Sequence, residues 1–379
     1  MVTRTIALYI HVPFCRRKCP YCAFVSYEHR EADIPRYLSA LKKELEQRAG
    51  GERVSSVYFG GGTPSLLPAE YLGDIISTIR SLFVVDEAAE ITIEANPGTI
   101  NQAYLASIRP VGVNRLSLGV QSLNDRELGL LGRVHAAAEA IDAVKLARGS
   151  GFDNLNIDLI YGLPGQSLPD WQMTLSQALA MTPEHLSLYA LSLEPGTPLR
   201  QAIENKSLPA IETDMSADQY ELAEDLLAEH GYRHYEISNW ARPGRECRHN
   251  LAYWLNQPYL GAGVAAHSYL DGHRLANTRS LDKYLTDFSG KSPPLPEMDE
   301  AISPELELAE TIILGLRRCE GIDINTMTQQ FDIDIRTRYQ KPFEEMTGAG
   351  LLEQTGERIR LTRRGRLLGN EVFWRFLPG

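Results

Sequence analysis

The sequence predicts an α/β fold: a partial (β/α)6 TIM-like barrel with a smaller, mainly helical, winged-helix-like domain at its C-terminal end. Six short runs of β-branched and aromatic residues alternate with segments of helical periodicity up to about residue 193. Motifs of unusual composition follow these runs, where the carboxyl ends of parallel strands form sites. A proline-rich segment near residues 290–304 marks a domain boundary. The alternation alone leaves an open doubly wound sheet as the alternative.

The predicted elements follow in order along the chain. The expected strands are TIALYIHV (5–12), VSSVYFGGG (54–62), EITIEANPG (90–98), VNRLSLGV (113–120), LNIDLIYG (155–162) and EHLSLYALSL (184–193). Helical periodicity is clearest at 33–50, 136–151, 216–231 and 305–321, whereas 232–270 is aromatic and glycine-rich without a clear period. Beyond the proline-rich segment we expect helices, a hairpin at 351–362 and a basic helix at 363–377. These patterns divide the chain into a barrel (1–213), an extension (214–290) and a C-terminal domain (300–379).

Composition excludes several classes of protein. The net charge of 38 − 49 = −11 argues against a general electrostatic grip on nucleic acid or anionic lipid, so we expect no nucleic-acid partner. No apolar run approaches the ~18 residues that a transmembrane segment needs. The N-terminus does not resemble a signal peptide. Five sparse, clustered cysteines are typical of a reducing compartment, so the expected location is cytoplasmic.

Three of the five cysteines, Cys15, Cys19 and Cys22, lie in one loop directly after the first predicted strand. Closely packed thiolates repel one another and need a soft metal between them, which means iron–sulfur or zinc. A four-iron cluster usually takes four cysteines, so three leave one iron open to an outside ligand. The alternative is a zinc site completed by His11 or a distant residue.

Polar residues and glycines occupy the later strand ends. Gly61, Gly62 and Thr63 follow the second strand, where glycine permits close approach to a ligand; a tight strand-to-helix turn is the alternative. Glu94 could take both hydroxyls of a ribose, and Arg133 could bind a carboxylate in a forked geometry. For each, a surface role is the alternative. Gln121 and Asp158 stand at further strand ends, and a carboxylate within an apolar strand such as that of Asp158 needs a partner.

The CxxxCxxC spacing, with Tyr21 before the last cysteine, resembles the radical S-adenosylmethionine (radical SAM) superfamily. In that superfamily a 4Fe–4S cluster binds S-adenosylmethionine at its open iron and cleaves it reductively. The resemblance therefore implies that the three cysteines hold such a cluster, with S-adenosylmethionine as cofactor and an electron donor as partner.

Six motifs narrow the resemblance to the HemN/HemW group: LYIHVPFCxxxCxYC, YFGGGTPS, IEANPG, SLGVQS, LGRVHxA and DLIYGLPGQ. They cover roughly residues 5–200, and a looser similarity continues to the end of the chain. The positions at which this resemblance implies contacts with S-adenosylmethionine are Tyr9, Gly61, Gly62, Thr63, Glu94, Gln121, Arg133, Asp158, Ala190 and His267.

Two departures separate this chain from the oxygen-independent coproporphyrinogen III dehydrogenases of the group. Those enzymes carry a further cysteine two residues after the cluster motif, where this chain has Phe24, and an extension before the first strand. Both departures match the heme chaperone branch. That resemblance implies heme as a ligand and heme-acceptor proteins as partners, while the dehydrogenase stays the alternative. Homodimer formation, the identity of the acceptor and the mode of heme attachment stay open.

The segment HNLAYW (249–254) fits the HNxxYW motif of the heme chaperone branch. Histidine is a common axial ligand of heme iron, and Tyr and Trp offer flat apolar surfaces to a porphyrin. The resemblance therefore makes His249 the expected heme contact. An ordinary aromatic loop, with His249 hydrogen-bonded to the backbone, is the alternative. Cys247 and Cys319 are expected to be buried free thiols.

Overall fold

The chain is organised around one sheet of twelve strands, ordered β14-β13-β12-β11-β1-β4-β5-β6-β7-β8-β10-β9, in a computed structural model that describes residues 4–290 and 294–378. Its centre consists of six parallel strands that neighbour one another in chain order, which confirms the predicted strands and the α/β fold. These are β1 (Thr5–Val12), β4 (Arg53–Gly61), β5 (Val84–Ala95), β6 (Arg115–Gln121), β7 (Leu155–Tyr161) and β8 (His185–Ala190).

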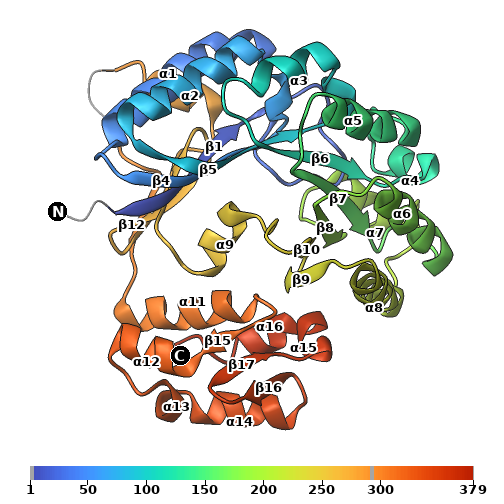
Figure 1. Cartoon of the computed structure of the whole chain (residues 1–379), viewed down its shortest axis with the longest axis vertical. Coiled ribbons are helices and arrows are strands. Elements are labelled where there is room, and N and C mark those ends of the chain that lie inside the picture. Colours follow the sequence, from blue (N-terminus) through green and yellow to red (C-terminus); the bar gives the residue numbers. More distant parts are fainter. Residues whose placement is uncertain (1–3, 291–293, 379) are drawn as a thin grey trace.

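Helices cover the convex side of this curved sheet, as the alternating pattern predicts (Figure 1). Their starts are set by local capping: Asn101, Asn124 and Ser167 each accept a hydrogen bond from a backbone N–H in the first turn of the helix that follows. The barrel helices are α1 (Ile34–Arg48), α2 (Ala69–Leu82), α3 (Gln102–Ile108), α4 (Asp125–Leu130), α5 (Ala137–Gly149), α6 (Leu168–Ala180), α7 (Pro198–Glu204) and α8 (Thr213–Glu229).

The barrel stays open, and short strands that lie between residues 233 and 301 extend it at both edges. A parallel strand, β11, lies beside β1 and is continued by antiparallel strands, while two antiparallel strands follow β8 on the other side. The extra strands are β9 (Arg233–Glu236), β10 (Asn239–Ala241), β11 (Tyr259–Ala262), β12 (His267–Leu270), β13 (His273–Ala276) and β14 (Met298–Ala301). Strand β14 lies within the segment read as a linker. Each of these six extra strands has only three or four residues, which is too few to show the alternation of apolar and polar residues that identifies a strand in the sequence.

The C-terminal domain has its own hydrophobic core, formed by residues between Leu308 and Phe376. Its helices are α11 (Pro304–Leu316), α12 (Ile324–Phe331), α13 (Ile335–Arg338), α14 (Gln340–Gly348), α15 (Arg363–Leu367) and α16 (Gly369–Phe373), and its small sheet contains β15 (Ile322–Asp323), β16 (Leu352–Thr355) and β17 (Arg358–Leu361). The predicted hairpin is confirmed. The predicted basic helix is interrupted at Leu368, next to Gly369, because glycine has low helix propensity.

Helix α9 (Arg248–Trp254) lies on the concave side of the sheet, between it and the C-terminal domain (Figure 1). Arg317, just after α11, places its guanidinium 4.6 Å from the centre of the Trp254 ring and 5.9 Å from that of Phe373. Such cation–π contacts contribute on the order of 1 kcal/mol each. The α9 segment is therefore held by both parts of the chain.

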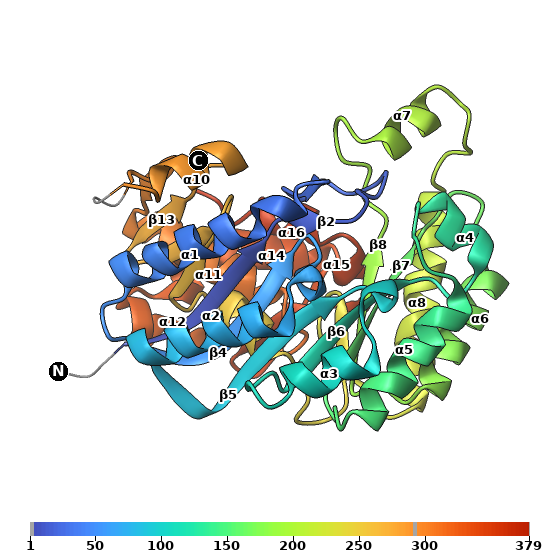
Figure 2. The same ribbon diagram turned by 90° about the horizontal axis from the view of Figure 1, so that it is seen from above.

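Seen from above, the convex helices run alongside the parallel strands, and α10 (Leu281–Asp287) lies on the same side as α1 (Figure 2). Buried Glu44 of α1 joins this region to the extension. It accepts hydrogen bonds from Tyr284 Oη at 2.6 Å, the Gly263 backbone N–H at 2.8 Å and Asn277 Nδ2 at 2.6 Å. Arg48 Nη1, at 3.2 Å, partly balances its charge. One carboxylate thus links four segments.

Glu44→Ala is predicted to lower the free energy of unfolding by about 3 kcal/mol, because it leaves several buried donors and Arg48 without their acceptor. Glu44→Gln should cost less, since its amide keeps one acceptor oxygen. Urea unfolding followed by circular dichroism measures both. Glu46→Ala, on the exposed side of the same helix, is the control and should change stability by less than about 0.5 kcal/mol. Equal stability of the Glu44→Ala and Glu46→Ala proteins would contradict the prediction.

Candidate functional site

The concave face of the parallel sheet is polar. Side chains at alternate positions of each strand point to the same face, and polar residues fill these positions on five successive strands. They hydrogen-bond across the strands: Asn156 Nδ2 donates to Ser117 Oγ at 2.8 Å, and His185 Nδ1 lies 2.7 Å from Asn156 Oδ1. The set comprises Ser56, Tyr58, Glu90, Thr92, Glu94, Arg115, Ser117, Asn156, Asp158, His185 and Ser187.

The three clustered cysteines lie at the carboxyl end of β1. Cys15 ends the short strand β2 (Phe14–Cys15), and Cys19 and Cys22 share a turn closed by a 3.1 Å backbone hydrogen bond before β3 (Tyr27–Glu28). Thr63 Oγ1 approaches Cys15 Sγ at 3.6 Å. Burial raises the pKa of the Cys15 and Cys22 thiols. Deprotonating these thiols therefore calls for a compensating positive charge such as a metal centre.

Glycines of the loop after β4 pack directly against the cysteine segment. The Gly62 N–H donates to the Val12 carbonyl and the Thr63 N–H to the Phe14 carbonyl, both at 2.8 Å. A Cβ on Gly62 would lie 2.7 Å from the Phe14 oxygen, and one on Gly61, whose φ is 113°, would overlap the His11 ring. Only glycine fits both positions without moving the backbone.

Glu94 projects beside these glycines. It accepts hydrogen bonds from Tyr58 Oη at 2.9 Å and from the Gly61 N–H at 3.1 Å. Glu94 as a whole residue is half-buried. Desolvation, reinforced by the nearby charge of Asp158, raises its pKa to about 7. The Glu94 carboxyl, at the carboxyl end of β5, therefore has a pKa close to neutral pH.

Arg133 connects Cys19 to the end of β6. Its Nη1 lies 3.5 Å from Cys19 Sγ, and its Nη2 donates to the Gly119 carbonyl at 2.7 Å. Its buried Nε has no hydrogen-bond partner within residues 4–290 and 294–378. Gln121 has a left-handed backbone conformation, with φ at 68°, and its side chain lies against Gly119. A Cβ added to Gly119 would lie 3.0 Å from Gln121 Nε2. Arg133 and Gln121 are thus brought together near the cysteines.

Asp158 and Ala190 are placed differently. Asp158 accepts hydrogen bonds from Asn156 Nδ2 at 2.7 Å and Ser117 Oγ at 3.1 Å, and burial raises its pKa. It is therefore a satisfied member of the concave polar network. Ala190 is exposed at the end of β8. No hydrogen bond joins either residue to the cysteine segment in the part of the chain described.

The arrangement of the thiols fits a cluster better than a single ion. Among the described residues, no three His, Cys, Asp or Glu side chains converge closely enough to hold one metal ion. A zinc site needs such convergence, whereas cysteines around a 4Fe–4S cluster bind different irons and stand further apart. The unpartnered Arg133 Nε and the glycine cradle beside the thiols also leave polar groups for a ligand next to the cluster.

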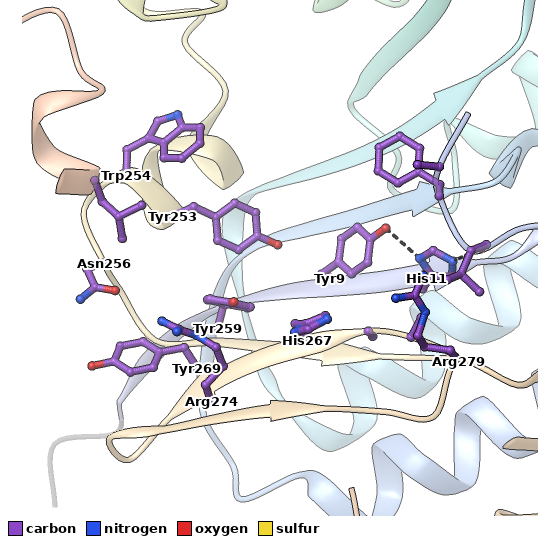
Figure 3. Close-up of a pocket in the computed structure, with 16 residues that line it drawn as sticks. Tyr9, His11, Tyr253, Trp254, Asn256, Tyr259, His267, Tyr269, Arg274 and Arg279 are labelled. Carbon is purple, nitrogen blue, oxygen red and sulfur yellow. Dashed lines mark hydrogen bonds between the residues drawn. The ribbon is translucent and has the colours of Figure 1, made fainter. Parts of the chain in front are cut away.

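Tyr9 separates the strand-end residues from a cavity of about 520 Å³ (Figure 3). On one side, the Tyr9 ring packs near Tyr58 and Glu94 around Gly60. On the other, it faces the cavity, with Tyr253 opposite it. The remaining lining residues are His11, Ala23, Phe24, Val25, Trp254, Asn256, Tyr259, Ala265, Ala266, His267, Tyr269, Arg274, Arg279 and Leu314.

His249 does not line this cavity. It is 1% exposed, and its Nδ1 lies 3.0 Å from Ser56 Oγ while its Nε2 lies 3.0 Å from Tyr253 Oη. Burial lowers its pKa to about 3, so the ring is neutral. Both ring nitrogens are engaged, and a heme contact through His249 stays a prediction that requires these bonds to break.

Sequence reasoning missed the groups that hold the site together. Ser56 and Tyr58 support His249 and Glu94, and fully buried Arg115 sits among the acidic residues of the concave face. The signal was the alternation of polar residues within apolar strands, which marks a face that is buried yet polar. Arg279 gave no comparable signal, whereas Tyr253 was already part of the HNxxYW motif.

Comparisons with known proteins agree with this geometry. Residues 9–178 match the Radical SAM superfamily, and residues 302–368 match the HemN C-terminal domain. The chain is 34% identical to the heme chaperone HemW of Bacillus subtilis, covering 97% of this chain and 98% of that protein. It is 40% identical to the HemW of Escherichia coli over 73% and 74% of the two chains.

A solved structure has the same fold over nearly the whole chain. Coproporphyrinogen III oxidase (HemN) from Escherichia coli, described as a radical SAM enzyme, superposes with a TM-score of 0.87 at 26% identity, covering 99% of this chain and 90% of that one. The partial barrel and the separate C-terminal domain are therefore shared with that protein.

Gly62→Ala is predicted to prevent assembly of the cluster that the superfamily implies, because its Cβ would push away the Phe14 carbonyl and with it Cys15. The measurement is the content of iron and sulfide per chain after anaerobic reconstitution, which should fall by more than half. Gly98→Ala, whose Cβ would meet nothing closer than 3.9 Å, should load normally. Full loading of the Gly62→Ala protein would show that the cradle is not needed.

Glu94 is predicted to make stability fall as the pH rises from about 4.5 to about 7. In this range the unfolded chain loses the proton that the folded protein keeps, so the folded state is disfavoured as pH increases. Glu94→Gln should remove this dependence, a difference of about 2 kcal/mol after allowance for partial solvent access. Urea unfolding across this range tests it, with exposed Glu87→Gln on the same strand as control. If the free energy of unfolding changes with pH in the same way in the unaltered protein and in both variants, Glu94 is not the source of the pH dependence.

Proposed function

The chain belongs to the HemW family of the radical SAM superfamily, and from this premise we propose that it is a heme chaperone that binds heme and delivers it to heme-requiring proteins. The observation that carries the proposal is the full-length likeness to a protein named a heme chaperone, 34% identical over 97% of this chain. The sequence matches on both sides of the domain boundary, so the proposal rests on the whole chain.

Cys15, Cys19 and Cys22 would hold the 4Fe–4S cluster, which supplies an electron to S-adenosylmethionine when that cofactor is bound. The surrounding residues fit such a cofactor: Arg133 presents a guanidinium beside Cys19, suited to a carboxylate, and Glu94 offers a carboxylate suited to ribose hydroxyls. The other proposed contacts are Tyr9, Gly61, Gly62, Thr63, Gln121, Asp158 and Ala190. His267, which the resemblance also implies, lies in the lining of the aromatic cavity beside Tyr9 and is considered with that cavity below. An electron donor is then a required partner of the reduced state.

Heme would be held next to this centre by the HNLAYW segment. Tyr253 and Trp254 from that segment line the cavity beside Tyr9, and their flat rings suit a porphyrin. The five cysteines are free, as expected in a reducing compartment, and we propose that the protein acts in the cytoplasm. No helix among the described residues is long and apolar enough to cross a membrane.

A second candidate is oxidative decarboxylation of coproporphyrinogen III, favoured by the structural likeness to HemN. Phe24 argues against this decarboxylation. It occupies the position of the further cysteine, and its ring, 67% accessible, is part of the cavity lining. A thiol at this position would add a reactive group to the cavity, and phenylalanine adds only an apolar surface.

One anaerobically reconstituted sample separates the two functions. Added heme should give a stable complex with a Soret band, and an apo form of a heme-requiring oxidoreductase mixed with this complex should regain activity. Coproporphyrinogen III, incubated with S-adenosylmethionine and a reductant, should remain unconverted. Formation of protoporphyrinogen would establish the dehydrogenase instead. A sample that binds no heme would reject the chaperone.

A further inference from the structure

The cavity beside Tyr9 has a floor made by one face of strands β11 to β13. Tyr269 lies opposite Tyr259 on one side and Arg274 on the other, and His267 is two residues before Tyr269 on the same strand. Side chains two residues apart on a strand share a face, so His267, Tyr269 and Arg274 project together. This floor comes from the region for which the sequence predicted no elements.

The opposite wall is aromatic. Tyr253 and Trp254 project from α9 (Figure 3), and Phe24 of the cysteine loop and Leu314 of α11 also line the cavity. Ligand cavities in proteins commonly measure about 300–1,000 Å³, and this one, at about 520 Å³, falls within that range. Aromatic side chains on several sides suit a large, flat, apolar ligand.

Three histidines lie in or beside this region, and they differ in what their rings already bind. His11 is buried, with Nδ1 3.0 Å from Tyr9 Oη and Nε2 2.8 Å from the Val25 carbonyl. His249 is buried with both nitrogens engaged, as described above. His267 is exposed to the cavity, and no hydrogen bond or ion pair joins its ring to residues 4–290 or 294–378. Only the His267 ring is free to bind a metal without breaking an existing bond.

Two arginines flank His267 in the cavity (Figure 3). Arg274 is already neutralised: Nη1 and Nη2 bind the Glu310 carboxylate at 3.0 and 2.7 Å. Arg279 is exposed, and its guanidinium has no hydrogen bond or ion pair with the described residues. It lies at the end of the cavity near the cysteine loop, where Tyr27 Oη donates to its carbonyl at 2.6 Å. Within the part of the chain that the structure describes, Arg279 is therefore the arginine of the cavity lining whose guanidinium has no carboxylate partner, and it lies at one end.

We propose that this cavity is the heme site, that His267 binds the iron, and that Arg279 binds the propionate carboxylates. The inference rests on the proposed function and adds the ligand set to it. Iron coordination needs a neutral imidazole, and burial, together with the two nearby arginines, lowers the pKa of His267 and so favours that form. An arginine fork is suited to a carboxylate. His249 then acts as a positioning residue that holds Tyr253 against the porphyrin from behind.

The experiment compares heme with iron-free protoporphyrin IX on the reconstituted full-length protein. His267→Ala should weaken heme affinity at least tenfold and shift the Soret band, and added imidazole should restore the band position. The same variant should bind protoporphyrin IX as the unaltered protein does, because no metal bond is lost. His273→Ala is the matched control. His273 lies on the neighbouring strand, 2.7 Å from Asp299, and its loss should change neither the affinity for heme nor that for protoporphyrin IX.

Arg279→Gln should weaken both porphyrins several-fold while leaving the Soret position unchanged, and exposed Arg364→Gln in the C-terminal domain should have no effect. Thermal unfolding of each variant separates ligand effects from misfolding. An unchanged Soret band and affinity in His267→Ala, with loss of the band in His249→Ala, would overturn the inference and leave the chaperone function standing. Failure of the unaltered protein to bind heme would reject both.

Discussion

The close approach of Gly61 and Gly62 to the end of β1 is the contact on which the site depends. It allows the Gly62 and Thr63 backbone to bond the carbonyls of Val12 and Phe14 at 2.8 Å, and these bonds fix the path of the chain into Cys15. The same loop brings Thr63 to the Cys15 sulfur and a backbone N–H to Glu94. A side chain at either glycine would separate the cysteine segment from the residues proposed to hold its cofactor.

The second constraint is that the concave face is enclosed and yet polar. Buried Arg115 lies near Glu90, Glu94 and Asp158, so part of the negative charge has a counter-charge within the protein. Burial raises the pKa values of the Glu94 and Asp158 carboxyls at the strand ends, and at Glu94 the nearby charge of Asp158 adds to the effect. His249 belongs to this network through Ser56 and Tyr253, so an iron bond at His249 would require one of these hydrogen bonds to break. The network makes one polar compartment, and Tyr9 divides it from the aromatic cavity.

The parallel strands and the cysteine loop could be predicted because each carries its signal locally, as β-branched runs or as close thiol spacing. The six flanking strands could not, since three or four residues interrupted by glycine and turns show no period. The cavity was equally out of reach, because His267, Arg279 and Tyr253 come from separate parts of the chain that meet beside Tyr9 only in the folded structure. Whether a histidine is engaged or free depends on neighbours distant in sequence, such as Ser56 for His249.

The packing of Arg317 against both Trp254 and Phe373 connects the cavity wall to the surface of the C-terminal domain. Trp254 forms part of the cavity wall, and Phe373 lies next to Trp374, a surface residue with 72% of its area accessible. Packed side chains of this kind transmit displacements, whereas a flexible linker absorbs them. The wall of the cavity and an exposed part of the C-terminal domain are therefore joined through the Arg317 side chain.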